Sequence, residues 1–157
     1  MPSSARLEYL FATRLVAVPT VTRTIALLAD QTLDDLHHTV RDAHGWDDDH
    51  LYAFWLKGRY WADDGSEYTH PLHAEMPDVL AAYTGAAPKQ SAAVPLARLR
   101  LQPGQRIAYV FDFGDEWRVD IRLSRIAAAG EGPHPRVVEA AGDAPPQYPH
   151  WDDADAA

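Results

Sequence analysis

The feature that most constrains this fold is a stretch of alternating apolar and polar residues in the last third of the chain. Residues 107–113 and 117–123 both alternate with period two and are rich in β-branched and aromatic side chains, and Gly114-Asp115-Glu116 separates them. This pattern predicts two strands joined by a three-residue hairpin loop, with Phe113 paired to Trp117. In that register four further residue pairs lie side by side: Phe111 with Val119, Tyr109 with Ile121, Ile107 with Leu123 and, on the other face, Asp112 with Arg118.

Residues 32–44 carry the signals of an amphipathic helix. Thr32 is a favoured N-cap residue, and Asp35 three positions later completes a variant of the capping box. Gly45 follows the segment and is suited to end the helix in the left-handed conformation. The apolar residues recur at helical spacing and form one stripe: Leu33, Leu36, Val40 and Ala43.

Three further segments set the fold class. Residues 6–16 and 21–29 alternate with period two and predict a first hairpin. Residues 50–61 are apolar on both faces, which is typical of an interior strand. Residues 62–94 form an irregular insert, with a short helix expected at 78–83. The order hairpin, helix, strand, insert, hairpin predicts an α+β protein, in which one helix packs across one face of a mixed β-sheet in a β-grasp-like order.

Length and composition predict one domain followed by a tail. A chain of 157 residues fits a single domain, which we expect to span residues 1–128. Residues 129–157 are rich in Gly, Pro and Asp and indicate a C-terminal tail that is partly docked or disordered. The chain contains no cysteine, which excludes disulfides and thiolate metal sites. Charged residues interrupt every apolar stretch before it reaches the length of a signal peptide or a membrane span, so a cytoplasmic protein is expected.

The net charge of −9 is unevenly distributed and bears on the choice of partner. Nucleic-acid binding gains most of its affinity by neutralising phosphates, so this acidic chain disfavours a nucleic acid and we expect a protein partner. Residues 81–126 are the exception, because seven bases against four acids give them a local charge of +3. Their arginines leave two readings open, a stripe that binds nucleic acid or an exposed strand face. They are Arg98, Arg100, Arg106, Arg118, Arg122 and Arg125.

A run of acidic residues and a histidine after the helix is the candidate metal site. Asp47, Asp49 and His50 offer the carboxylate and imidazole ligands that divalent cations such as Mg²⁺, Mn²⁺ or Zn²⁺ use. Asp112 and Asp115 of the late hairpin would join them if the strand that begins at His50 lies beside that hairpin. The alternative is a solvated turn whose adjacent aspartates diverge. A divalent metal is the only cofactor that the residues suggest, and nothing in the sequence requires one.

A second candidate is a surface for a protein partner. His37, Trp46, Trp55 and Trp117 form this candidate interaction surface, with burial in the core as the alternative reading of such side chains. The sequence contains no Gly-x-Ser-x-Gly elbow, P-loop or His-Glu-x-x-His motif. The lack of a recognisable catalytic motif favours a non-catalytic interaction module over an enzyme.

Three segments together resemble the plasmid pRiA4b ORF-3-like family. They are residues 32–37 (Thr-Leu-Asp-Asp-Leu-His), residues 45–54 (Gly-Trp-Asp-Asp-Asp-His-Leu-Tyr-Ala-Phe) and residues 109–117 (Tyr-Val-Phe-Asp-Phe-Gly-Asp-Glu-Trp). The resemblance implies a plasmid or mobile-element context, since members are often called insertion-element passenger or resolvase-like proteins. It implies no settled activity and no catalytic residues. Members often carry cysteines near the end of the chain, and this sequence has none, so no role of those cysteines carries over.

Overall fold

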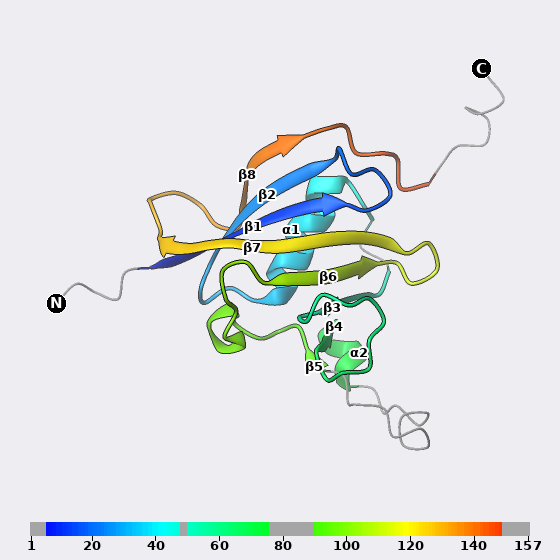
Figure 1. The fold of residues 1–157 in the computed structure, drawn as a ribbon, viewed down its shortest axis with the longest axis horizontal. Coiled ribbons are helices and arrows are strands. Elements are labelled where there is room, and N and C mark those ends of the chain that lie inside the picture. Colours follow the sequence, from blue (N-terminus) through cyan, green and yellow to red (C-terminus); the bar gives the residue numbers. More distant parts are fainter. Residues whose placement is uncertain (1–5, 48–49, 76–89, 149–157) are drawn as a thin grey trace.

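The computed structural model describes residues 6–47, 50–75 and 90–148, which form a sheet accompanied by short helical segments (Figure 1). Along the chain the elements are β1 (Leu7–Leu15), β2 (Thr22–Leu28), α1 (Leu33–His44), β3 (Tyr52–Trp55), β4 (Glu67–Thr69), α2 (Pro71–Glu75), β5 (Gln90–Ser91), the 3-10 helix η1 (Leu96–Leu99), β6 (Arg106–Phe111), β7 (Trp117–Ala128) and β8 (Arg136–Ala141). No helix among these elements is long and apolar enough to cross a membrane.

The eight strands form one sheet in the order β5-β4-β3-β6-β7-β1-β2-β8. The neighbours β4 and β5 are parallel, and the other neighbouring strands are antiparallel. The sheet is therefore mixed, and the α+β class is confirmed. The β-grasp-like order is not confirmed, because β4 and β5 extend the sheet at one edge and β8 extends it at the other.

Helix α1 lies across one face of the sheet (Figure 1), and its predicted ends are confirmed. The Thr32 hydroxyl accepts a hydrogen bond from the Asp35 backbone N–H at 3.1 Å, and the Asp35 carboxylate accepts one from the Thr32 N–H at 2.9 Å. Gly45 ends the helix with a φ of 74°. Three of the four residues of the apolar stripe, Leu33, Leu36 and Val40, are fully buried, and the fourth, Ala43, is partly buried.

The two faces of the sheet carry two apolar clusters of different size. The large cluster lies on the α1 side and takes the residues that alternate inward from the long strands: Phe11, Leu15, Ile25, Leu27, Tyr52, Phe54, Ile107, Tyr109, Phe111, Val119, Ile121 and Leu123. The small cluster lies on the opposite face of β3 and β6 and contains Ala53, Trp55, Ala108 and Val110. Tyr60 and Ala62, from the loop after β3, pack against this small cluster. The rest of the opposite face therefore has no apolar cover among the described residues.

The late hairpin forms as predicted, but the predicted register is wrong by two residues. Phe111 pairs with Trp117, and the chain turns through a five-residue loop, 112–116, in place of the expected three. Tyr109 is paired with Val119, and Ile107 with Ile121. Val110, in place of Asp112, is the partner of Arg118.

Asp112 is the physical reason for the shorter ladder. Its φ of 64° takes the backbone out of the extended conformation. Its carbonyl accepts a hydrogen bond from the Glu116 N–H at 2.6 Å, and its carboxylate accepts from the N–H groups of Gly114 and Asp115 at 3.1 and 3.3 Å. An aspartate that bonds the backbone two and three residues ahead favours a turn over a strand. Because the shift is two residues, the side chains keep their predicted faces.

The remaining predicted strands are present with altered lengths. β1 and β2 lie within residues 6–16 and 21–29, and β3 lies between β4 and β6 as an interior strand, although it is shorter than residues 50–61. The insert 62–94 contributes β4, α2 and β5, and the helix expected at residues 78–83 lies outside the described residues.

The segment 129–157, expected to be a tail, contains strand β8, which pairs with β2. Gln147 from the same segment accepts a hydrogen bond from the Asp47 N–H at 2.7 Å. Residues 149–157 lie outside the described residues, and the domain boundary at residue 128 stays a prediction.

The turn after β8 offers a test of this docking. Gly142 has a φ of 76°, and a Cβ at this position would lie 2.5 Å from the Thr20 carbonyl oxygen. We expect Gly142→Ala to lower the free energy of unfolding by about 1–3 kcal/mol, because it adds backbone strain and a clash with fixed main chain. Equilibrium urea unfolding measures the change. In the matched control Gly130→Ala, the new Cβ meets nothing within 4 Å, so a change within about 0.5 kcal/mol is expected. Equal losses in both variants would contradict the described packing of β8.

Candidate functional site

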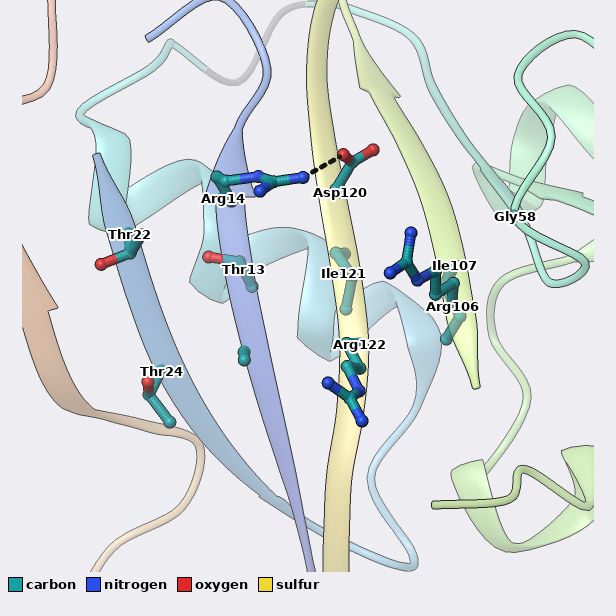
Figure 2. Close-up of a pocket in the computed structure, with 11 residues that line it drawn as sticks. Thr13, Arg14, Thr22, Thr24, Gly58, Arg106, Ile107, Asp120, Ile121 and Arg122 are labelled. Atoms are coloured by element: carbon teal, nitrogen blue, oxygen red, sulfur yellow. Dashed lines mark hydrogen bonds and ion pairs between the residues drawn. The ribbon is translucent and has the colours of Figure 1, made fainter. Parts of the chain in front are cut away.

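The face of the sheet opposite α1 holds a groove of about 450 Å³ between β6, β7, β1 and β2. Figure 2 shows Arg14, Asp120, Arg106 and Arg122 on the near side of these strands, with α1 behind the sheet. Its charged lining residues are Arg14, Arg106, Asp120 and Arg122, and Thr22 and Thr24 line it from β2. We call this set the arginine groove.

Strand alternation positions these side chains. Ile107 and Ile121 point into the large cluster, so their neighbours Arg106 and Arg122 point to the opposite face. Arg122 is also the partner of Ala12 on β1, and Ala12 is the partner of Thr24 on β2. One cross-strand row therefore runs Arg106, Arg122, Ala12, Thr24, with two long cations at one end and small side chains at the other.

The two arginines of this row stand directly opposite each other on β6 and β7. Both are exposed. Among the described residues neither forms a side-chain hydrogen bond or an ion pair. Opposite Cβ atoms in an antiparallel pair are about 4.5–5.5 Å apart, and like charges there destabilise the sheet. Arg106 and Arg122 thus create a local excess of positive charge that the described residues do not neutralise.

The neighbouring row contains a cation that is neutralised. Arg14 Nη2 lies 3.2 Å from Asp120 Oδ2, which is its cross-strand partner. Asp120 Oδ1 accepts a hydrogen bond from the Tyr60 hydroxyl at 2.6 Å. Burial raises the pKa of Tyr60 above its ordinary value, and the bond to Asp120 adds to this effect, so the hydroxyl keeps the proton that it donates. The Arg118 guanidinium lies over the Tyr60 ring, 4.8 Å from its centre.

The arginine stripe predicted from the sequence is divided by the structure. Arg106 and Arg122 line the groove, whereas Arg118 pairs with Glu116 at 3.2 Å. Arg98 belongs to η1 and does not line the groove. The sequence reasoning missed Arg14, which comes from β1 more than 100 residues away from Asp120. The alternation of β1 indicated that the Arg14 side chain points away from the core. Nothing near Arg14 in the sequence indicated which strand would lie beside β1.

The structure brings together two of the five predicted metal ligands. His50 Nδ1 lies 3.6 Å from Asp112 Oδ2, and His50 Nε2 lies 2.5 Å from the Tyr148 hydroxyl. Asp47 and Asp115 are exposed, and Asp49 lies outside the described residues. No group of three or more His, Cys, Asp or Glu side chains with metal-binding geometry occurs in the described part of the chain. Among these residues, therefore, the His50–Asp112 contact links the start of β3 to the hairpin loop.

The predicted interaction surface is largely in the core. His37 is 1% exposed, Trp46 5% and Trp55 0%, and Trp117 is partly buried. These side chains are buried because each of them packs against other aromatic rings. Trp46 stacks on Phe111 at 5.2 Å and lies 5.6 Å from Trp117, which places the turn after α1 against the late hairpin as expected.

A buried polar network fixes α1 to the central strands. His37 Nδ1 hydrogen bonds with the Tyr109 hydroxyl at 2.8 Å, and the His37 ring stacks on Tyr52 with centroids 3.6 Å apart. The Tyr52 hydroxyl donates to Asp34, whose other oxygen lies 3.2 Å from His38 Nε2. Polar groups that are buried and fully hydrogen bonded favour one packing arrangement over others. His37 is therefore a structural residue of the helix–sheet interface.

The fold and the groove define a class of protein: an α+β protein with helix α1 across one face of its sheet and a basic groove on the other. The chain belongs to the plasmid pRiA4b ORF-3-like protein family, whose pattern matches residues 14–148.

Relatives of known sequence or structure agree with this assignment. The chain is 26% identical over 130 residues to the uncharacterized protein y4hQ of Sinorhizobium fredii (strain NBRC 101917 / NGR234). The aligned region covers 82% of this chain and 59% of y4hQ. The chain thus spans less than two thirds of that relative. The crystal structure of a protein of unknown function, MM3350 from Methanosarcina mazei Go1, has a similar fold, with a TM-score of 0.70 and 22% identity over 92% of this chain and 74% of that one. The match over residues 14–148 gives the family, and the similarity to MM3350 gives the fold; neither determines the function.

His44, at the end of α1, makes stability depend on pH. The residue is 6% exposed, and among the described residues neither ring nitrogen has a hydrogen-bond partner. Burial lowers the pKa of His44 from 6.5 to about 4, and the charge of Arg23 adds to the shift. Because the unfolded chain takes up the proton first, this contribution to stability is complete above pH 6.5 and is lost as the pH falls toward 4.

We therefore expect the free energy of unfolding to fall by up to about 3 kcal/mol through this single residue between pH 6.5 and pH 4. Replacing His44 with Phe keeps an aromatic ring against Trp46 and removes the titration, so the variant should show a flatter dependence in urea unfolding at a series of pH values. Parallel curves for wild type and His44→Phe would show that His44 is not held neutral.

Proposed function

We propose that this protein is a non-catalytic interaction module that binds an anionic group of its partner in the arginine groove. The observation that carries the proposal is the direct opposition of Arg106 and Arg122, neither of which forms an ion pair among the described residues. Such a pair costs about 0.2–1 kcal/mol when no anion is present. An anion placed between the two guanidinium groups turns this repulsion into two charge-assisted attractions.

Size and composition support a ligand site. The volume of about 450 Å³ falls in the range of small-molecule clefts. Guanidinium groups bind carboxylates and phosphates through two parallel hydrogen bonds, which gives geometric selectivity as well as affinity. Thr22 and Thr24 add hydroxyl donors on the opposite wall. The groove therefore has the charge, the donors and the room that an anionic group needs.

The state of Asp120 supports binding over catalysis. Asp120 is the carboxylate among the lining residues, and its two oxygens are engaged by Arg14 and by Tyr60. A carboxylate held between a cation and a donated proton is a poor general base. The groove thus offers recognition groups, and we assign it a binding role.

A charge-matched set of variants tests the proposal. In low salt we expect Arg106→Gln and Arg122→Gln each to raise the free energy of unfolding by about 0.2–1 kcal/mol, because each removes one of two opposed like charges. Sodium sulfate should stabilise the wild type by RT ln(1 + [L]/Kd) through site binding, and this increment should be absent from both variants. Urea unfolding with and without sulfate measures both effects.

Arg98→Gln is the control, because it removes the same charge from an exposed residue outside the groove. Its sulfate response should equal that of the wild type, including the general stabilisation that sulfate exerts on folded proteins. An identical sulfate response in the wild type and in all three variants would overturn the proposal.

Metal binding at the Asp47–His50 loop remains the alternative, and the short distance between His50 and Asp112 favours it. A metal ion there would bind His50 through Nδ1, the nitrogen that faces Asp112, while Nε2 keeps its hydrogen bond with the Tyr148 hydroxyl. For this alternative, Zn²⁺ or Mn²⁺ should raise the melting temperature of the wild type and leave His50→Gln unchanged. Thermal unfolding with and without a chelator measures the shift, and equal melting temperatures in all samples would remove the alternative.

A further inference from the structure

We infer that the ligand of the arginine groove is a phosphate monoester in its doubly charged form. This inference rests on the proposed anion-binding role and adds the chemical class of the ligand. It follows from three properties of the site: its net charge, the arrangement of its donors and the charge of the surrounding protein.

The groove has a net charge of two positive charges, which a ligand with two negative charges would neutralise. Three arginines and one aspartate line it. Arg14 and Asp120 neutralise each other at 3.2 Å, which leaves Arg106 and Arg122 as two cations without an ion-pair partner among the described residues. A singly charged ligand such as a phosphodiester would leave one of the two opposed charges uncompensated. A phosphate monoester carries close to two negative charges at neutral pH, since its second pKa is about 6.

The arrangement of donors suits a tetrahedral group with three free oxygens. Arg106 and Arg122 approach from adjacent strands, while Thr24 and Thr22 lie on the other side of Ala12 and Arg14. A planar carboxylate presents two oxygens in one plane, and one guanidinium fork satisfies both. A terminal phosphate presents three oxygens in different directions and so accepts hydrogen bonds from two forks and a hydroxyl together.

The shape of the site and the charge of the chain disfavour a nucleic acid. The lining residues include no aromatic side chain on which bases could stack. Glu139 is the cross-strand partner of Thr24 and continues the row with a negative charge, so a polyanion that crosses the sheet would meet it. The net charge of −9 adds a long-range repulsion that grows with the charge of the ligand. A terminal phosphate enters the groove and avoids both obstacles.

The experiment measures binding of five probes by isothermal titration calorimetry at low salt: glucose 6-phosphate, a phosphoserine peptide, dimethyl phosphate, sulfate and a single-stranded oligonucleotide. At pH 7.5 we expect glucose 6-phosphate and the phosphoserine peptide to bind at least tenfold more tightly than dimethyl phosphate. The two monoesters carry the same dianion, so either one supports the inference and the tighter one identifies the source as a metabolite or a modified protein. Arg106→Gln and Arg122→Gln should each weaken the monoesters more than tenfold, and Arg98→Gln should leave them unchanged.

The pH dependence gives an independent readout. No histidine lines the groove, so the change in charge between pH 5 and pH 7.5 falls on the ligand. Binding of glucose 6-phosphate should strengthen about tenfold over this interval as the second proton leaves a phosphate with a pKa of about 6. Sulfate is doubly charged at both pH values, so its affinity should stay constant. Any change in its affinity would come from titration of the protein.

The outcomes separate this inference from the proposed function. Equal affinity for dimethyl phosphate and glucose 6-phosphate would overturn the inference that the ligand is a dianion. The proposed anion-binding function would still stand. A single-stranded oligonucleotide that binds more tightly than either monoester would also overturn it, in favour of a phosphodiester ligand. Failure of every anion to bind would overturn the inference and the proposed function together.

Discussion

The pairing of β1 with β7 is the contact on which the rest of the structure depends. It joins the N-terminal hairpin to the late hairpin through registers such as Arg14 with Asp120 and Leu15 with Val119. Without it, the chain would form two separate sheets, β5-β4-β3-β6-β7 and β1-β2-β8, and the apolar face that receives α1 would be divided between them. With it, one continuous apolar face receives the helix stripe, and the same alternation sends every second side chain of β1, β6 and β7 to the opposite face. The core and the arginine groove are thus two consequences of one ladder.

The two faces of this sheet differ in what they carry, because the α1 face holds most of the core and the opposite face holds the proposed binding groove. The sequence suggested the aromatic side chains as a partner surface. In the structure they pack into the core, because Trp46, Phe111 and Trp117 bury one another at the end of α1. The opposite face holds Arg106 and Arg122 opposite each other, and neither forms an ion pair among the described residues. Opposed like charges slightly oppose folding, and proteins retain such local conflicts at sites where a ligand resolves them. This contrast between the faces is why the groove, and not the tryptophan cluster, is the proposed binding site.

Much of the local structure was predictable from the residues. The capping box of Thr32 and Asp35 and the left-handed Gly45 act within a few residues, so α1 begins and ends where the sequence indicates. The late hairpin was predictable as well, but its loop was not, since the preference of Asp112 for a turn overrides the alternation that extends to Phe113. The site was harder to predict. Arg106 and Arg122 belong to the predicted arginine stripe, whereas Arg14 becomes part of the site only through a strand pairing that spans more than 100 residues.

The sequence by itself determined the class of the fold, the helix, the faces of the strands and the family, because periodicity, caps and motif residues act over short separations. Only the tertiary structure decided the order of the eight strands, the incorporation of β8 from the expected tail and the opposition of two arginines across a ladder. The physical reason is that the choice of strand partners depends on the burial of the whole apolar face. That burial is a property of all the strands together and is not encoded in any single segment.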